Sequence, residues 1–303
     1  MKRIFIIGLL ACLLPTLVSA QSQRWKRTRY ELYGGIGSTN FLGELGGSEE
    51  SGAGFIKDFE FSASRPLISL GMRYKILEPL AVKGALSFGY LYGNDNKSEN
   101  EFRYKRNLMF RSPIIELGFQ GEYSVIKERI SRYRRSSRRG KFSLASLNLN
   151  VYIFTGFNVF WFNPQAKGID GNWYNLQPIG TEGQGKIETR DKYSRLQVSI
   201  PGGFGLKYPI TQKISVGLEY GARLTFTDYI DDVSTTYVDR NLFTNENEQY
   251  LADPSNFTDA NGNPIEMGPG DIRGNPKYND FYMFMVINVT YKLRTGRNGM
   301  PKF

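Results

Sequence analysis

The chain has 303 residues, and its 39 Lys and Arg against 29 Asp and Glu give a formal net charge of +10. It contains one cysteine and no histidine. These counts exclude disulfide bonds within the chain, and they exclude hydrolase or acyltransferase mechanisms that depend on a histidine general base.

The first twenty residues predict a secretory signal peptide. A basic pair precedes the apolar run 4–14, and Val18-Ser19-Ala20 offers a small-residue cleavage site. Leu-Leu-Ala-Cys12 loosely resembles a lipid-attachment box, but the apolar run continues beyond Cys12, which favours the signal peptide. Removal of this segment, with Lys2 and Arg3, lowers the formal net charge from +10 to +8 and leaves residues 21–303 as one domain. No run of 18 apolar residues follows, so no transmembrane helix is predicted.

Eight segments alternate apolar and polar residues, the pattern of β-strands with two different faces. The clearest is 213–227, KISVGLEYGARLTFT, in which every second residue is apolar. A strand this long suits a tilted crossing of a bilayer, which needs about 9–11 residues. In chain order, the predicted strands cover 28–37, 67–76, 80–92, 115–125, 147–162, 195–208, 213–227 and 281–293.

The connections between these strands alternate in length. Tight turns are predicted at 77–79 and 209–212. The polar segments 38–66, 93–107, 163–192 and 228–280 are long and rich in Gly, Asn and Asp. Outer-membrane barrels sort their connections in this way, with extended outer loops and short periplasmic turns. A soluble sandwich has no reason to do so.

Aromatic residues form two groups that support the same fold. Tyr residues 30, 74, 123, 208 and 291 fall at one end of the strands, and residues 90, 92, 161, 226 and 281 at the other. Rings at two membrane–water interfaces produce such belts. We therefore predict an all-β fold, an eight-stranded antiparallel transmembrane β-barrel with long outer loops, in the outer membrane of a Gram-negative bacterium.

Three details qualify this prediction. Segments 55–61 and 102–110 have some strand character, so a barrel of ten strands is the alternative to extensions of the eight. Pro201 falls inside a predicted strand, and a closed barrel has no edge to accommodate it. We therefore expect a β-bulge at Pro201-Gly202-Gly203.

The polar faces of the strands predict a charged interior. A barrel of eight strands is just wide enough for side chains to fill it, and charges of both signs can pair there. This favours a packed polar interior over a conducting pore. The predicted inward set is Arg73, Lys75, Lys83, Glu116, Gln120, Glu122, Lys207, Glu219 and Arg223, with Arg73, Glu116, Glu122, Glu219 and Arg223 as its lumen network.

Asp228, Asp231 and Asp232 cluster where the strand 213–227 enters the longest loop. Such a cluster can bind calcium, and a metal-dependent hydrolase borne on the loops would need it to do so. We favour the simpler interpretation that these carboxylates accept hydrogen bonds from backbone amides in the turn. No catalytic residue, cofactor site or metal site is therefore predicted.

The connection 126–142 breaks the alternation, because it should be short yet carries eight positive charges and one negative between Lys127 and Lys141. Nucleic acid is absent from the periplasm, so anionic lipid or an acidic protein remains as the partner. We favour a protein. The predicted partner-binding residues are Arg129, Arg132, Arg134, Arg135, Arg138, Arg139 and Lys141.

Several motifs carry a resemblance to a known family. They are 35–45, Asn163-Pro164, Trp173-Tyr174-Asn175-Leu176-Gln177-Pro178, Gly180-Thr181-Glu182-Gly183-Gln184-Gly185, Ile200-Pro201-Gly202-Gly203-Phe204-Gly205 and Asp228-Tyr229-Ile230-Asp231-Asp232-Val233-Ser234. In this order they resemble the PorG-like outer-membrane barrels associated with the type IX secretion system of Bacteroidota.

The resemblance implies a non-enzymatic barrel in contact with outer-membrane lipids and with a periplasmic ring formed by a lipoprotein and its partner. That machinery exports proteins with a C-terminal sorting signal, often for gliding motility. A passive small channel or a surface adhesin is the alternative function.

Overall fold

The computed structural model describes residues 23–45, 63–98, 100–128, 148–259, 261–296 and 298–302. The predicted signal peptide 1–20, the segment 55–61 and the basic residues 129–141 lie outside the described residues. The eight predicted strands are confirmed. They are β1 (Tyr30–Leu42), β2 (Arg65–Lys75), β3 (Leu80–Asn94), β4 (Met109–Ile126), β5 (Asn150–Phe162), β8 (Leu196–Pro209), β9 (Ile214–Thr225) and β10 (Phe281–Thr295).

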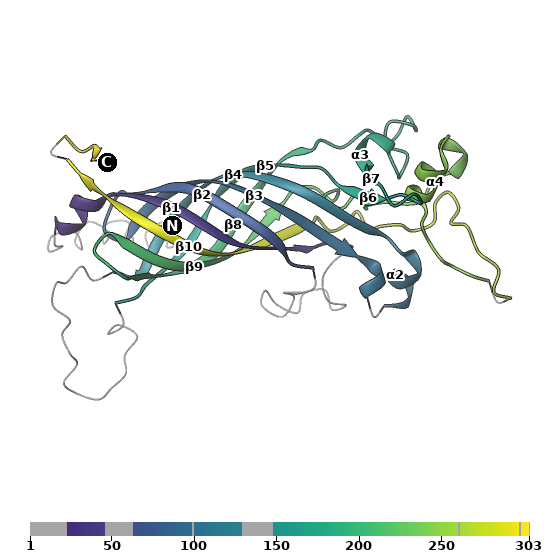
Figure 1. Cartoon of the computed structure of the whole chain (residues 1–303). Coiled ribbons are helices and arrows are strands. Elements are labelled where there is room, and N and C mark those ends of the chain that lie inside the picture. The colour runs from purple at the N-terminus through teal and green to yellow at the C-terminus, as the bar shows by residue number, and fades with distance from the viewer. Residues whose placement is uncertain are drawn as a thin grey trace, which may run out of the picture.

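These strands form a closed antiparallel barrel (Figure 1). Each of these strands pairs with the next, and β10 returns to pair with β1 over the whole length of β1, Tyr30 with Leu293 and Leu42 with Phe281. Because hairpin neighbours need no crossover, alternate connections emerge at opposite ends. The tight turns β2–β3 and β8–β9 define a short-turn end, and the long loops define a long-loop end.

Short elements decorate both ends (Figure 1). A 3₁₀ turn, η2 (Gln23–Thr28), and the small strand β11 (Pro301–Lys302) lie at the short-turn end. The long loops contain η3 (Asp95–Lys97), α2 (Glu101–Arg106), β6 (Gln165–Lys167), β7 (Trp173–Asn175), α3 (Leu176–Ile179), η5 (Arg240–Leu242) and α4 (Glu246–Ala252). We call the folded long loops the outer cap. No helix in the described ranges is long and apolar enough to cross a membrane.

The barrel has eight strands, so the ten-stranded alternative is wrong. Residues 102–106 are helical, because Asn100 accepts hydrogen bonds from the backbone amides of Phe102 and Arg103 and caps α2. The predicted bulge at Pro201 is also wrong. Pro201 lacks a pairing partner on β5 but keeps Arg223 opposite it on β9, with no shift of register. A shift occurs instead between β4 and β5, at Ser124.

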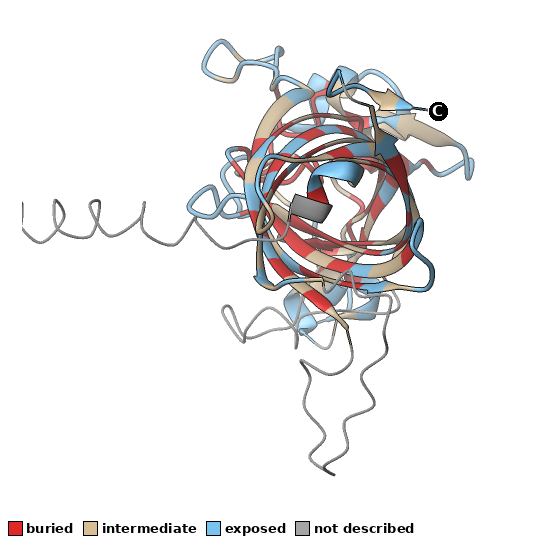
Figure 2. Ribbon diagram, turned by 90° about the vertical axis from the view of Figure 1, so that its left-hand side faces the viewer, coloured by how far each residue is buried: buried red, intermediate tan, exposed pale blue. Residues whose placement is uncertain are grey.

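Burial in the barrel wall is the inverse of that in a soluble protein. In β2, the outward side chains Ile68, Leu70 and Met72 are 53, 61 and 41% exposed, whereas Ser69 and Arg73 are 4 and 1% exposed. Viewed along the axis, the strands form a closed ring, and buried residues recur along them between more exposed ones (Figure 2). Apolar side chains therefore face outward, where lipid would cover them, and polar side chains face the lumen.

The N-terminal turn closes the short-turn end. Figure 2 shows η2 lying across the opening of the barrel. Trp25 is 7% exposed and borders a cavity of about 30 Å³ that is also lined by Arg73, Lys75 and Lys207. The guanidinium of Arg29 lies 5.0 Å from the centre of the Trp25 ring. The predicted strands did not reveal this plug, since η2 lies outside the alternating pattern.

The lumen near the long-loop end is filled by an apolar core instead of charges. Phe160 contacts Tyr282, with ring centres 5.4 Å apart, and Phe41 meets Phe110 at 4.8 Å. The sequence shows this only as strands that are apolar on both faces near their outer ends. The buried cluster comprises Tyr33, Phe41, Leu45, Leu67, Leu91, Leu108, Phe110, Ile114, Phe160, Phe162, Ile230, Val233, Tyr282, Phe284 and Val286.

Candidate functional site

Two polar sites are built by this fold: an ion-pair network in the lumen and a charged cluster in the outer cap. The lumen network is centred on Arg73, which lies 3.1 Å from Glu31, 2.5 Å from Glu122 and 3.7 Å from Glu219. Lys83 also pairs with Glu219. Arg73 is 1% exposed, so its charge depends on these carboxylates for compensation.

The network continues in both directions along the barrel axis. Toward the short-turn end, Glu31 pairs with Lys75 at 2.8 Å and Lys207 at 2.9 Å. Toward the apolar core, Arg223 pairs with Glu116 at 3.3 Å, and the hydroxyl of Tyr282 donates to the same carboxylate at 2.7 Å. The structure thus places all five predicted network residues in the lumen. Glu219 and Arg223, close in the sequence, have different partners.

The lumen retains little free space around these side chains. A second cavity, of about 20 Å³, lies between Tyr33, Lys83, Glu116 and Phe154. A cavity of this size holds one or two water molecules. With η2 below and the apolar core above, the described lumen is filled along its length.

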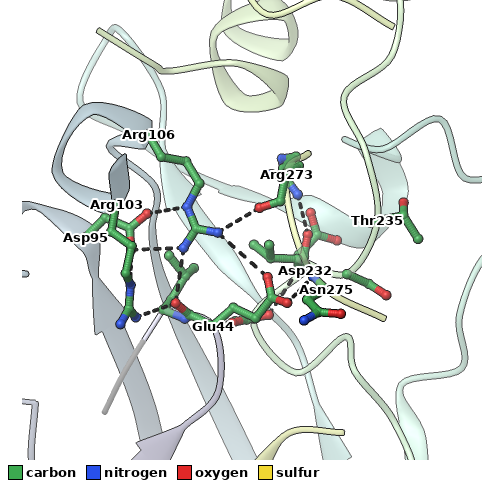
Figure 3. Close-up of polar contacts among 12 residues, drawn as sticks. Glu44, Asp95, Arg103, Arg106, Asp232, Thr235, Arg273 and Asn275 are labelled. Carbon is green, nitrogen blue, oxygen red and sulfur yellow. Dashed lines mark hydrogen bonds and ion pairs between the residues drawn. The ribbon is translucent and has the colours of Figure 1, made fainter. Parts of the chain in front are cut away.

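The cluster in the outer cap is organised by Arg106 of α2 (Figure 3). Its guanidinium donates two hydrogen bonds to Asp95, at 2.7 and 3.1 Å, and one to the carbonyl of Arg273 at 2.7 Å. It also donates to the carbonyl of Glu44, at the start of the loop that follows β1. Three loops, β1–β2, β3–β4 and β9–β10, are therefore fastened at one buried cation.

Arg273 makes the second junction of the cap. It donates to the Glu182 carboxylate at 3.0 Å and to the carbonyl of Asp232 at 2.6 Å. Glu182 in turn accepts from the backbone amides of Ser234 and Thr235. Two of the motifs behind the family resemblance, about fifty residues apart in the chain, thus meet at this junction. We call the contacts of Arg106, Arg273 and Glu182 the cap clamp.

The backbone around Glu182 requires glycine. Gly180, Gly183 and Gly185 have φ angles of 66, 83 and 71°, the left-handed region that other residues rarely adopt. A Cβ on Gly180 would also lie 2.3 Å from the carbonyl of Gln184. The Gly-Thr-Glu-Gly-Gln-Gly motif therefore describes a tight loop that presents Glu182 to the next segment.

The three aspartates predicted to cap the turn occupy different environments. Asp231 accepts from the backbone amides of Leu45 and Val233, as the favoured interpretation expects. Asp232 instead accepts from the hydroxyls of Thr181 and Tyr193, and Asp228 accepts from no backbone amide of the described residues, so the favoured interpretation is wrong for these two. Among the described residues, no group of three potential ligands could hold a metal ion.

Burial raises the pKa of several carboxyls in the cap. The pKa of Asp228 rises to about 8, mainly through burial and also through the negative charges of Glu44 and Glu182. Burial raises that of Glu44 to about 7, against the opposing effect of Arg106. Burial likewise raises the pKa of Asp232 to about 6, although Arg273 opposes it. The cap therefore holds protons that the unfolded chain would release.

Sequence reasoning located the lumen charges but missed the cap clamp. The predicted partner-binding residues 129–141 lie outside the described residues. Arg106 and Arg273 were not singled out, because their partners are far away in the chain. The only available signals were Asn100 ahead of the short basic segment, a helix N-cap, and the glycine spacing around Glu182.

A closed barrel of eight long strands with an apolar exterior and a charged, filled interior defines this chain as a transmembrane β-barrel of the outer-membrane type. It belongs to the DUF6089 family, a domain of unknown function, whose model matches residues 9–251. No curated protein matches the chain.

Three solved barrels illustrate the structural similarity. Ail of Yersinia pestis, in complex with the heparin analogue sucrose octasulfate, is 9% identical with a TM-score of 0.38 and covers 88% of this chain and 99% of its own. Neisserial surface protein A is 7% identical with a TM-score of 0.37, and the match covers 87% of this chain and 96% of that protein. OprG of Pseudomonas aeruginosa is 8% identical with a TM-score of 0.36, and the match covers 88% of this chain and 95% of OprG. The strand pairing of this chain defines its fold independently of them.

We predict that Arg73→Gln destabilises the folded barrel by about 3–5 kcal/mol, because it leaves buried carboxylates without their cation. Urea unfolding in lipid vesicles measures this. The matched control is Arg240→Gln, which breaks an exposed pair with Glu266 and should cost less than about 1 kcal/mol. Adding Glu122→Gln to Arg73→Gln should restore part of the loss. Equal stability of the two single variants would contradict the role of Arg73.

We also predict that the outer cap becomes less stable as the pH rises from about 5 to about 8. Carboxyls with a raised folded-state pKa bind more protons folded than unfolded in this window, so stability falls as they ionise. Hydrogen exchange at the amides of 230–235, corrected for intrinsic rates, measures it. Asp228→Asn should flatten the dependence, whereas Asp259→Asn, in an exposed turn, should not. Greater protection at pH 8 would refute the prediction.

Proposed function

We propose that this chain is a non-enzymatic barrel of the outer membrane of a Gram-negative bacterium, serving the type IX protein secretion machinery. In this proposal its short-turn end docks to the periplasmic ring formed by a lipoprotein and its partner, and so supports export and gliding motility. The observation that carries the proposal is the concentration of basic charge at that end. The family resemblance supplies the identity of the machinery.

The described surface of the short-turn end is strongly basic. Its acidic residues Glu78 and Glu128 are half-buried and paired, Glu78 with Lys127 at 3.4 Å and Glu128 with Lys292. The basic segment leaves β4 at Ile126 and returns at Asn150, so both of its attachment points lie at this end. An acidic protein surface complements such a face. The exposed basic residues here are Lys26, Arg27, Lys127, Lys213, Arg294 and Lys302.

The filled lumen supports a docking role over transport through the barrel itself. A solute would have to pass η2, the ion pairs of Arg73 and the apolar core around Phe160. Opening that path means separating buried charges, which is costly. The passive-channel alternative therefore has little support. A catalytic role also has little support, since Glu182, Asp231 and Asp232 hold loop segments together and the chain contains no histidine.

We predict that replacing Arg132, Arg134, Arg135 and Arg138 with Gln reduces co-purification of the ring proteins from detergent-solubilised membranes by about ten-fold or more. The matched control replaces the same four residues with Lys, which keeps the charge and should keep most of the binding. Both variants should remain folded and heat-modifiable on gels. Undiminished ring binding by the Gln variant would refute the docking role. A surface adhesin would keep export intact in both variants.

We further predict that the purified barrel gives no stable conductance steps in planar bilayers, because its lumen is filled. The conductance of the Arg73→Gln, Glu122→Gln double variant is measured for comparison, since these substitutions remove the ion pair at the centre of the network. Steady conductance of the unmodified barrel would support the channel alternative instead.

A further inference from the structure

Cationic side chains lie over aromatic rings on the outer wall of the barrel at its long-loop end. The guanidinium carbon of Arg111 lies 3.7 Å from the ring centre of Trp173, and the Lys167 ammonium lies 5.5 Å from it. Arg65 lies 3.8 Å from the ring centre of Tyr92. With Lys97, 5.8 Å from the Tyr92 ring, we call this set the cationic rim.

Strand pairing places Tyr92, Arg111, Lys167 and Trp173 of the cationic rim on one outward-facing patch. Tyr92 of β3 is paired with Arg111 of β4, and Lys167 with Trp173 in the β6–β7 hairpin. Directly paired residues share a face of a sheet. The residues just before Tyr92, Arg111 and Lys167 in sequence, which are Leu91, Phe110 and Ala166, lie on the opposite face and are buried. Tyr92, Arg111 and Lys167 therefore face away from the lumen.

The height of the rim matches a lipid headgroup region. Tyr90 and Pro113 are paired two residues nearer the middle of the barrel wall than Tyr92 and Arg111, on the same outer face. Tyr90 is 37% exposed and belongs to the apolar wall. Two residues of a strand span about 6–7 Å, which becomes about 5 Å along the membrane normal at the usual tilt. The polar layer outside the hydrocarbon core is about 5–7 Å thick on each side. Arg111 and its neighbouring cations therefore lie at the depth of the lipid headgroup phosphates.

The charges of Arg111 and Lys167 are available to a ligand. Arg111 donates from its Nε to the neutral side chain of Gln165 at 3.1 Å. Within the described part of the chain, neither Arg111 nor Lys167 forms an ion pair with a carboxylate. A guanidinium held flat on a ring still presents its outer N–H groups, which suit a phosphate well.

We propose that the cationic rim binds a phosphate group of the phosphorylated glycolipid in the outer leaflet, with Arg111 and Lys167 as its principal ligands. Trp173 and Tyr92 orient the cations and sit at the membrane interface. The site would fix the rotation and depth of the barrel in the membrane. This inference rests on the outer-membrane location proposed above, and it is independent of the secretion role.

The test measures binding of lipid A to the purified full-length barrel by native mass spectrometry in detergent. Two lipids with the same acyl chains are compared, bisphosphorylated lipid A and its dephosphorylated form. We expect the phosphorylated lipid to bind preferentially. The double variant Arg111→Gln with Lys167→Gln should weaken its binding about 25-fold, at about five-fold per charge. Millimolar inorganic phosphate should not compete, because the acyl chains hold the headgroup at the site.

The matched control removes one Arg and one Lys from the opposite end, Arg294→Gln with Lys302→Gln, and should leave binding unchanged within about two-fold. Heat-modifiability on gels shows that both double variants remain folded. Equal binding of the two lipids, an equal loss in both double variants, or competition by inorganic phosphate would overturn the proposal. Failure of ring docking would leave it standing, since no ring protein takes part in this measurement.

Discussion

The pairing of buried charges across the lumen is the constraint on which the barrel depends. Apolar residues cover the outside, so the polar residues of each strand must face a space just wide enough for side chains. Arg73 meets three carboxylates there, contributed by β1, β4 and β9. A shift of β2 by one residue would turn Arg73 toward lipid and Met72 inward. The ion pairs therefore help to fix the register as well as fill the interior.

The interior changes character along the barrel axis, and this separates the two ends. Charges fill the half near the short turns, whereas Phe160, Tyr282 and their neighbours fill the half beneath the outer cap. The cap rests on that apolar core and is fastened by Arg106 and Arg273. Each end is consequently a closed surface, basic at the short turns and folded at the long loops.

How much could be predicted differs between the wall and the cap. Strand positions followed from alternation, because lipid outside and charges inside impose a strict period of two. The residues that face the lumen could be predicted from the same period of two, because they are the polar residues that alternate with the apolar ones. The cap did not, because Arg106 binds groups near residues 44, 95 and 273, and no local pattern connects them. The strand character predicted for 102–110 is wrong for residues 102–106 for a similar reason. The helix there is stabilised by the Asn100 cap and by the contacts of Arg106.

The sequence by itself determined that the chain crosses a membrane as an eight-stranded barrel, with polar residues inward and long loops at one end. Alternation and loop length are local properties, and a lipid exterior translates them directly into a fold. Only the tertiary structure decided which charges pair, that η2 closes one end, and that Glu182 meets the segment after Asp232. These contacts join residues distant in sequence, and they exist only once barrel closure has brought the strands and loops together.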